Sequence, residues 1–377
     1  MKIPMVNMLA GYPEIKDEVE NSVKNVFNKA NFILGEEVAQ FEKEFAAFNG
    51  AKYAVGVANG TDALRLAIIA CGIKKGDEII TSPFTFISTS ETISQAGAIP
   101  VFADIDPETY NLNYKDVEKK ITSKTKAILP VHLYGYPAEM DKIMDLAKKH
   151  NLKVIEDSAQ SFTAKYKFKQ TDWKYAGTMG DCGTFSFFPA KNLGAFGDGG
   201  MIITNNENIY NELKALRNHG SKARYIHDME GFNSRLDTVQ AAILSIKLKH
   251  IEKWTEMRNK VAEKYAGALK DIAKVPVLNE NCKHSFNYYT IKFEDKETRD
   301  KVQKHLSDNG IANNIYYPIA LHRQKAYAHL KTEALPVSEN TQDTVLSLPM
   351  YPELPDEHIK IITDCIREGV QIAATTK

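Results

Sequence analysis

Short apolar runs and amphipathic stretches alternate along the chain between residues 53 and 205. Runs of β-branched and other apolar residues bounded by turn residues predict strands. These strands are expected at residues 53–57, 78–82, 100–105, 127–133, 153–157, 182–188 and 201–204. Amphipathic helices are expected between most of them, for example over residues 61–70 and 140–150. The alternation predicts an α/β fold with a mostly parallel central sheet and helices on both faces.

The two ends of the chain have a different pattern. An arm and two helices, over residues 14–29 and 36–48, precede the first strand. Helical periodicity returns over 209–218 and 236–271, and is followed by a strand at 288–293, a helix at 298–308 and a closing helix from 355. We therefore expect an N-terminal arm and large domain over residues 1–250, and a smaller α+β domain over residues 251–377.

Composition excludes several classes of protein. Lys plus Arg and Asp plus Glu both total 48, which argues against a general binder of nucleic acid or anionic membranes. No apolar run approaches the roughly 20 residues that span a bilayer, and the N-terminus has no signal-peptide pattern. The four cysteines are widely separated and lack metal-ligand spacing. We therefore expect a cytoplasmic protein with reduced thiols and no metal site.

Lys191 is the most informative single residue. The strand-like run before it is stopped by Pro189, which cannot extend a ladder, and glycines follow from Gly194 onward. A lysine on such a constrained loop is a candidate for forming a Schiff base, because an amine with suppressed charge attacks carbonyl carbons. Loop lysines are usually solvated, but the flanking Phe187 and Phe188 favour a partly buried one.

Asp157 lies at the end of another predicted strand, and Gln160 follows three residues later. Ligands of parallel sheets sit at the carboxyl ends of strands, where both Asp157 and Lys191 fall. Pyridoxal phosphate needs an anion opposite its ring nitrogen and an amine for its aldehyde. Gln160 is placed to hydrogen-bond the phenolic oxygen of that ring. The alternative for Asp157 is a carboxylate that caps the next turn.

Three further segments fit the same cofactor. Gly60 and Thr61 open a helix after a strand, where free N–H groups attract a phosphate, and the hydroxyl of Ser186 could contact the same group. Phe86 could stack on a flat ring. Each has an ordinary alternative: a helix start, a solvated hydroxyl or a core aromatic.

Taken in order, these motifs resemble the DegT/DnrJ/EryC1/StrS family of pyridoxal-phosphate-dependent nucleotide-sugar aminotransferases. The resemblance extends over nearly the whole chain. It rests on Asn59-Gly60-Thr61-Asp62, Thr85-Phe86, Asp157-Ser158-Ala159-Gln160, Ser186-Phe187-Phe188-Pro189-Ala190-Lys191-Asn192, Gly197-Asp198-Gly199-Gly200 and Asn233-Ser234-Arg235-Leu236-Asp237.

The resemblance implies a fold-type I aminotransferase that works as a homodimer with shared active sites. Lys191 would bind the cofactor aldehyde, and Asp157 would pair with the ring nitrogen. The phosphate would be held by Gly60, Thr61 and Ser186, joined by Asn233 from the neighbouring subunit. Read without the resemblance, Asn233 precedes a helix and would be its N-cap.

The resemblance also implies the reaction. L-Glutamate would donate an amino group through the cofactor to a UDP- or dTDP-linked keto sugar, at C3, for polysaccharide or lipopolysaccharide biosynthesis. Amination of a 4-keto sugar is one alternative. Another is a sugar dehydratase, although family dehydratases carry histidine in place of Lys191. A regulatory protein that keeps the fold without turnover is a third, and a nicotinamide dehydrogenase is disfavoured because no convincing G-x-G-x-x-G follows the first strand.

Three segments bear on substrate contacts, and for Arg224 and for residues 165–177 a solvated surface segment is the alternative to contact with the nucleotide. The stretch 313–322 resembles a substrate-side loop, which suggests Tyr316 and His322, although Ala320 stands where relatives usually have proline. Arg224 is a candidate for the diphosphate, because a guanidinium suits that geometry. The basic, aromatic segment 165–177 is longer than the usual family turn and is expected to form an exposed hairpin.

Overall fold

The computed structural model describes residues 2–169, 171–223 and 225–375. Within them, the largest sheet has seven strands in the order β1-β9-β8-β5-β4-β2-β3. The strands are β1 (Tyr53–Val57), β2 (Glu78–Thr81), β3 (Ile99–Phe102), β4 (Thr125–Leu129), β5 (Lys153–Asp157), β8 (Cys182–Ser186) and β9 (Gly200–Thr204). Only β9 runs against its neighbours β1 and β8 in this sheet; the other pairs are parallel. The expected α/β fold with a mostly parallel sheet is confirmed.

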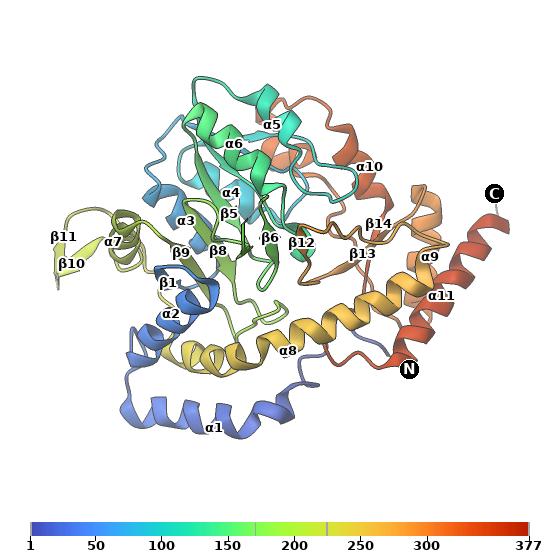
Figure 1. Ribbon diagram of the computed structural model, residues 1–377, viewed down its shortest axis with the longest axis horizontal. Coiled ribbons are helices and arrows are strands. Elements are labelled where there is room, and N and C mark those ends of the chain that lie inside the picture. The colour runs from blue at the N-terminus through green and yellow to red at the C-terminus, as the bar shows by residue number, and fades with distance from the viewer. Residues whose placement is uncertain (1, 170, 224, 376–377) are drawn as a thin grey trace.

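Helices cover both faces of this sheet (Figure 1). One face packs on α3 (Gly60–Ala70) and α7 (Glu207–Leu216). The other packs on α2, α5, α6 and α8; these are α2 (Glu36–Asn49), α5 (Tyr114–Lys120), α6 (Met140–His150) and α8 (Thr238–Leu269). Neighbouring strand residues therefore contact different helices, as Ile202 and Ile203 do. Burial on both faces explains why the strands are continuous apolar runs.

The long helix α8 extends from the sheet to the C-terminal elements, and α1 (Tyr12–Lys29) lies along it (Figure 1). The C-terminal elements include β13 (Tyr289–Lys292), β14 (Val345–Leu348), α9 (Lys296–Asp308), α10 (Pro336–Thr344) and α11 (Asp356–Thr375). Along α8, Trp254 packs in the core of the large unit and Val261 in the core of the small one. Ile3 of the N-terminal arm also packs in the small unit. We propose that the domain boundary lies within α8, between Trp254 and Val261.

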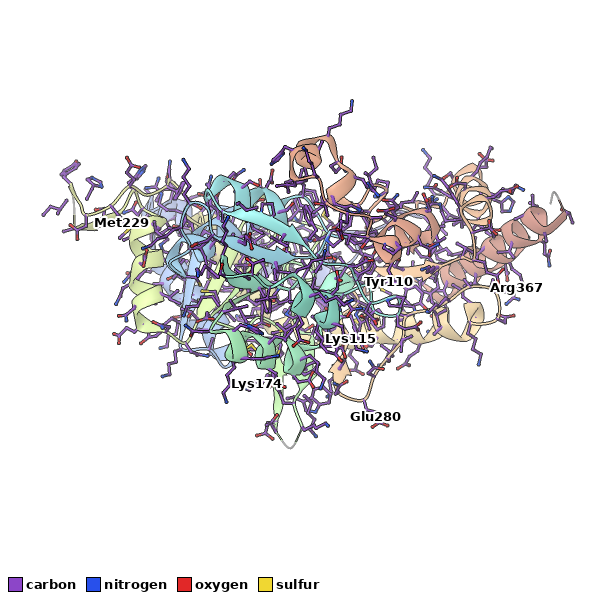
Figure 2. The ribbon with its side chains drawn as sticks, turned by 90° about the horizontal axis from the view of Figure 1, so that it is seen from above. Tyr110, Lys115, Lys174, Met229, Glu280 and Arg367 are labelled. Atoms are coloured by element: carbon purple, nitrogen blue, oxygen red, sulfur yellow. The ribbon has the colours of Figure 1, made fainter. Side chains whose placement is uncertain are left out.

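Two hairpins project from the body. The first pairs β6 (Lys165–Lys167) with β7 (Trp173–Tyr175), and β12 (Cys282–Lys283) extends it to three strands. Lys174 marks its projecting position in Figure 2, and the expected exposed hairpin is confirmed. The second pairs β10 (Ser221–Ala223) with β11 (Ile226–His227), and Met229 marks it in the same view.

The remaining short helices are α4 (Ser88–Gln95), η1 (Leu133–Gly135), η2 (Leu321–Arg323) and η3 (Lys325–Leu330). The fourth strand was expected over 127–133 but ends at Leu129. Pro130 lacks the N–H that a further ladder bond requires, and its carbonyl instead accepts from the Asp157 N–H at 2.9 Å. Over the residues that the structure describes, no helix is long and apolar enough to cross a bilayer.

Candidate active site

A cavity of about 660 Å³ lies at the carboxyl ends of β5 and β8. Side chains from both units of the chain line it, because the loop after α9 reaches over the sheet edge. It brings together eight of the residues expected from the sequence: Gly60, Thr61, Phe86, Asp157, Gln160, Ser186, Lys191 and Tyr316. Their convergence follows from the sheet order, since β5 and β8 are parallel neighbours and end at the same edge.

Asp157 is buried at the floor of this cavity. Its Oδ2 accepts from the Thr89 hydroxyl at 2.8 Å, and its Oδ1 accepts from the Ala159 N–H at 3.2 Å. Burial raises the pKa of Asp157, while these two donors and the charge of Lys191 oppose the rise. A buried carboxylate held by two donors is suited to face a cationic ring nitrogen.

Lys191 lies in the loop that connects β8 to β9. Residues 187–199 form this connection, and β9 returns antiparallel to β8. Within the loop, the Lys191 N–H donates to the Phe188 carbonyl and the Ala195 N–H donates to the Phe187 carbonyl, each at 2.8 Å. Burial lowers the pKa of Lys191 to about 8, and the charge of Asp157 opposes this. A much larger fraction of the amine than in a solvated lysine is therefore neutral and nucleophilic near neutral pH.

The start of α3 forms a polar cradle beside Ser186. The Asn59 side chain caps the helix by accepting from the Asp62 N–H at 2.8 Å, and the Asn59 carbonyl accepts from the Ala63 N–H at 3.0 Å. The N–H groups of Gly60 and Thr61 remain at the helix N-terminus beside the cavity. A Cβ on Gly60 would lie 2.7 Å from the Cβ of Ser186, so glycine is required for this close approach.

Phe86 and Gln160 define the upper part of the cavity. Phe86 is 57% exposed, although a large aromatic side chain is usually covered. The Gln160 Nε2 donates to the Tyr317 hydroxyl at 2.8 Å, and its Oε1 accepts from the Tyr134 N–H at 2.8 Å. The amide is thus fixed in one orientation, with its donor toward Tyr317 and its acceptor toward Tyr134.

Comparison with known protein families identifies the family of this chain. A model described as the DegT/DnrJ/EryC1/StrS aminotransferase family matches residues 13–367. The chain belongs to this family. The resemblance that the sequence motifs suggested is therefore confirmed.

Individual relatives cover almost the whole chain. A pleiotropic regulatory protein from Geobacillus stearothermophilus is 44% identical over 98% of this chain and 98% of the relative. UDP-N-acetyl-3-dehydro-alpha-D-glucosamine 3-aminotransferase from Acidithiobacillus ferrooxidans is 44% identical over 97% of each. The crystal structure of S. venezuelae DesV in complex with a ketimine intermediate has a TM-score of 0.93 at 37% identity, covering 98% of this chain and 99% of that one.

Two predicted residues lie outside the cavity lining, and a third is outside the part of the chain that the structure describes. Asn233 is exposed, and its backbone pairs with that of Asn218 in an isolated antiparallel β-bridge. The expectation that Asn233 caps the following helix is wrong, because α8 begins at Thr238 and Asp237 occupies the N-cap position. His322 is buried, with its Nε2 2.9 Å from an oxygen of Glu339. Arg224 lies outside the described residues.

Sequence reasoning missed two residues that hold predicted ones in place. Thr89 donates to Asp157 from the first turn of α4, and Tyr317 accepts from Gln160. The segment after the second predicted strand already suggested Phe86 as a site residue. If a helix is assumed to begin there, Thr89 follows Phe86 by about one turn and would have been a further candidate. Tyr317 is adjacent to the predicted Tyr316, and no periodicity in that loop distinguishes which of the two side chains turns toward Gln160.

The residues around the cavity fit pyridoxal phosphate. A helix N-terminus beside a hydroxyl suits a phosphate, a buried carboxylate suits a ring nitrogen, and a partly neutral amine suits an aldehyde. The exposed face of Phe86 is available for stacking on a flat ring. The set supplies one matching group for each polar end of this cofactor.

Proposed function

We propose that this chain transfers an amino group to C3 of a 3-keto nucleotide sugar, with pyridoxal phosphate as the carrier of that group. The observation that carries the proposal is the meeting of Lys191 and Asp157 in one cavity beside the N-terminus of α3 and Ser186. Membership of the aminotransferase family supports the reaction class. The position C3 is supported by the relative named as a 3-aminotransferase of a UDP sugar.

When bound, pyridoxal phosphate supplies an electron sink for the carbanion formed beside the amino group. Asp157 keeps a negative charge under the ring nitrogen, and the Thr89 hydroxyl holds that carboxylate in place. In its neutral form, Lys191 would accept a proton from the carbon atom on one side of the transferred nitrogen and return it to the carbon atom on the other side. Its lowered pKa keeps this amine poised for both steps near neutral pH.

The remaining site residues orient the reactants. Gly60, Thr61 and Ser186 are proposed to hold the phosphate, and Gln160 to hydrogen-bond the phenolic oxygen. Phe86 is proposed to cover the ring. Substrate contacts by Tyr316, by His322 and by Arg224 remain proposals that rest on the family resemblance.

We propose a homodimer in which Asn233 of one subunit completes the phosphate site of the other. Asn233 is exposed in the single chain, as this role requires. Large apolar side chains also stay exposed near the cavity and its loop, among them Phe86, Phe188 and Phe196. Clusters of exposed apolar residues mark interaction surfaces, and a two-fold assembly would bury the same surface on both copies.

We further propose L-glutamate as the amino donor and a UDP- or dTDP-linked sugar as the acceptor, in the cytoplasm, for polysaccharide or lipopolysaccharide synthesis. All four cysteines are free thiols, which suits a reducing compartment. The sulfurs of Cys71 and Cys182 lie 3.8 Å apart and are joined by a hydrogen bond, with no disulfide between them.

The decisive experiment separates the two half-reactions. The protein would first be converted to its pyridoxamine form with L-glutamate, and 2-oxoglutarate would be measured. It would then be mixed with a panel of 3-keto and 4-keto nucleotide sugars while absorbance reports the return of the aldehyde form. Return with 3-keto sugars alone supports C3 amination. Return with 4-keto sugars alone moves the reaction to C4, and a sugar product without 2-oxoglutarate identifies a dehydratase.

A regulatory role is the second candidate, because one relative at 44% identity is named a pleiotropic regulatory protein. The intact set of Lys191, Asp157 and Gln160 in one cavity supports turnover. A purified protein that takes up pyridoxal phosphate yet releases no keto acid from any amino donor would favour regulation.

A further inference from the structure

Side chains on one face of α8 form hydrogen bonds to the backbone of the loop that carries Lys191. Gln240 binds the Phe196 backbone on both sides: its Oε1 accepts from the N–H at 2.8 Å, and its Nε2 donates to the carbonyl at 3.3 Å. Two turns further along α8, the Lys247 ammonium donates to the Gly194 carbonyl. Residues seven apart lie on the same face of a helix, so these contacts form one attachment surface.

The Gly194 peptide is a sensitive point of that loop. A Cβ on Gly194 would lie 2.2 Å from the Pro189 carbonyl oxygen, so the loop folds closely back on itself here. Lys191 lies between these two residues in the chain. Any shift of the Gly194 peptide therefore moves the short segment from which the Lys191 side chain extends.

Lys247 occupies an unfavourable place for a lysine. It is half-buried at the wall of a second cavity of about 510 Å³, which residues 6–9 of the N-terminal arm also line. Burial, with the nearby charge of Arg258, lowers the pKa of Lys247 to about 8, while Glu353 opposes the change. An apolar side chain would fill this position without that desolvation cost. What the lysine adds is a donor to the Gly194 carbonyl, together with an ammonium 5.2 Å from the centre of the Phe196 ring.

We propose that Lys247 is a positioning residue for Lys191, which fixes the Gly194 carbonyl and thereby aims the reactive amine at the cofactor aldehyde. This inference rests on the proposed function, because it assumes that Lys191 forms an imine. It assigns Lys247 no contact with the sugar or with the cofactor phosphate. Small losses of alignment between reacting atoms slow a reaction strongly, even when binding is preserved.

The test measures imine formation alone. Cofactor-free Lys247→Met would be mixed with pyridoxal phosphate, and the absorbance of the imine would be followed in time. We expect the rate to fall about tenfold or more, as loss of a charge-assisted hydrogen bond would allow. Affinity for pyridoxine 5'-phosphate, which lacks the aldehyde, should stay within about twofold, because the phosphate cradle is a separate site. Lys247→Arg, which retains a cationic donor, should restore much of the rate.

Two further variants keep the result decisive. Lys249→Met removes an exposed lysine of the same helix, and it should match the wild type in both measurements. Gln240→Met removes the neighbouring attachment, and it should show the Lys247→Met pattern even where Lys247→Met itself folds poorly. Wild-type imine rates in both Lys247→Met and Gln240→Met would overturn the proposal, as would an equal loss of pyridoxine 5'-phosphate binding.

The outcome is distinguishable from failure of the proposed function. No sugar is present, so a wild-type protein that forms the imine but aminates no 3-keto sugar leaves the role of Lys247 intact. A wild-type protein that forms no imine at Lys191 would refute the proposed function and this inference with it.

Discussion

Lys191 and Asp157 are opposite charges that burial drives toward their neutral forms. Burial raises the pKa of Asp157 and lowers that of Lys191 to about 8. For the lysine this is useful, since only the neutral amine can attack an aldehyde. For the aspartate it is a cost, which the Thr89 and Ala159 donors reduce in part.

The first prediction concerns the pH dependence of imine formation. The rate with pyridoxal phosphate should rise with pH and level off above about 8, because the folded-state pKa of Lys191 lies below its ordinary value of 10.5. Stopped-flow absorbance from pH 6 to 11 would measure it. Lys191→Ala should show no imine at any pH and no transamination. An inflection near 10.5 would mean that the amine is solvated.

The second prediction separates activity from stability at Asp157. Its raised pKa means that the folded state binds this proton more tightly than the unfolded state does. Stability from this group is therefore present at low pH and is lost as pH rises through the raised pKa. The side chain of Asp157→Asn stays neutral, so this variant does not lose free energy of unfolding as pH rises. The cofactor-free variant should therefore melt at or above the wild-type temperature at pH 7.

Transamination by Asp157→Asn should nevertheless fall on the order of 100-fold, since the ring nitrogen loses its anion. Thermal unfolding and the glutamate half-reaction would be measured on the same samples. A variant that melts well below the wild type would show that the carboxylate is needed for the fold.

At the scale of elements, the site depends on close approach between a helix and two strands. The start of α3 packs against the end of β8, where Gly60 meets Ser186. The first residue of β9 approaches as closely, because a Cβ on Gly200 would lie 2.3 Å from the Asn59 carbonyl oxygen. Glycine is required at both points, so the phosphate cradle is a product of packing between elements.

The third prediction compares two glycines in helices. Gly60→Ala should weaken binding of pyridoxal phosphate by about tenfold or more, because the new methyl group pushes α3 from Ser186. Gly267→Ala in α8 meets open space, and it should raise the free energy of unfolding by about 0.5–1 kcal/mol. Fluorescence titration and chemical denaturation would measure the two effects. Unchanged cofactor affinity in Gly60→Ala would contradict the proposal that the start of α3 and Ser186 hold the phosphate.

At the scale of the whole molecule, one chain leaves the proposed site open. Asn233 is exposed and distant in sequence from the cradle it is proposed to complete, and aromatic side chains such as Phe188 remain exposed at the cavity. An isologous dimer would place each Asn233 at the partner's phosphate site and cover those surfaces at the same time.

The fourth prediction tests this by complementation. Lys191→Ala and Asn233→Asp should each be inactive as pure dimers, the second because its carboxylate repels the phosphate. Mixed by unfolding and refolding together, they should recover about a quarter of wild-type activity, since half the dimers are mixed and each has one intact site. Mixing without subunit exchange is the control. No recovery after exchange would place Asn233 and Lys191 of the same chain in one site.

The sequence alone determined the layers of the fold and which residue types meet at the candidate site. Alternating strands and helices predicted the parallel sheet, and the strand-end positions of Asp157 and Lys191 predicted that they would meet. This succeeded because periodicity is local, and the carboxyl ends of parallel strands share one edge whatever the loops do. The family resemblance, carried by short contiguous motifs, supplied the reaction.

Only the tertiary structure decided which groups hold those residues. Thr89 beneath Asp157, Tyr317 against Gln160 and Lys247 behind the Lys191 loop are contacts between segments far apart in the chain. No spacing rule encodes them, because they depend on where a helix face meets a loop. The lowered pKa of Lys191 has the same origin, since desolvation is a property of the packed surroundings of the amine.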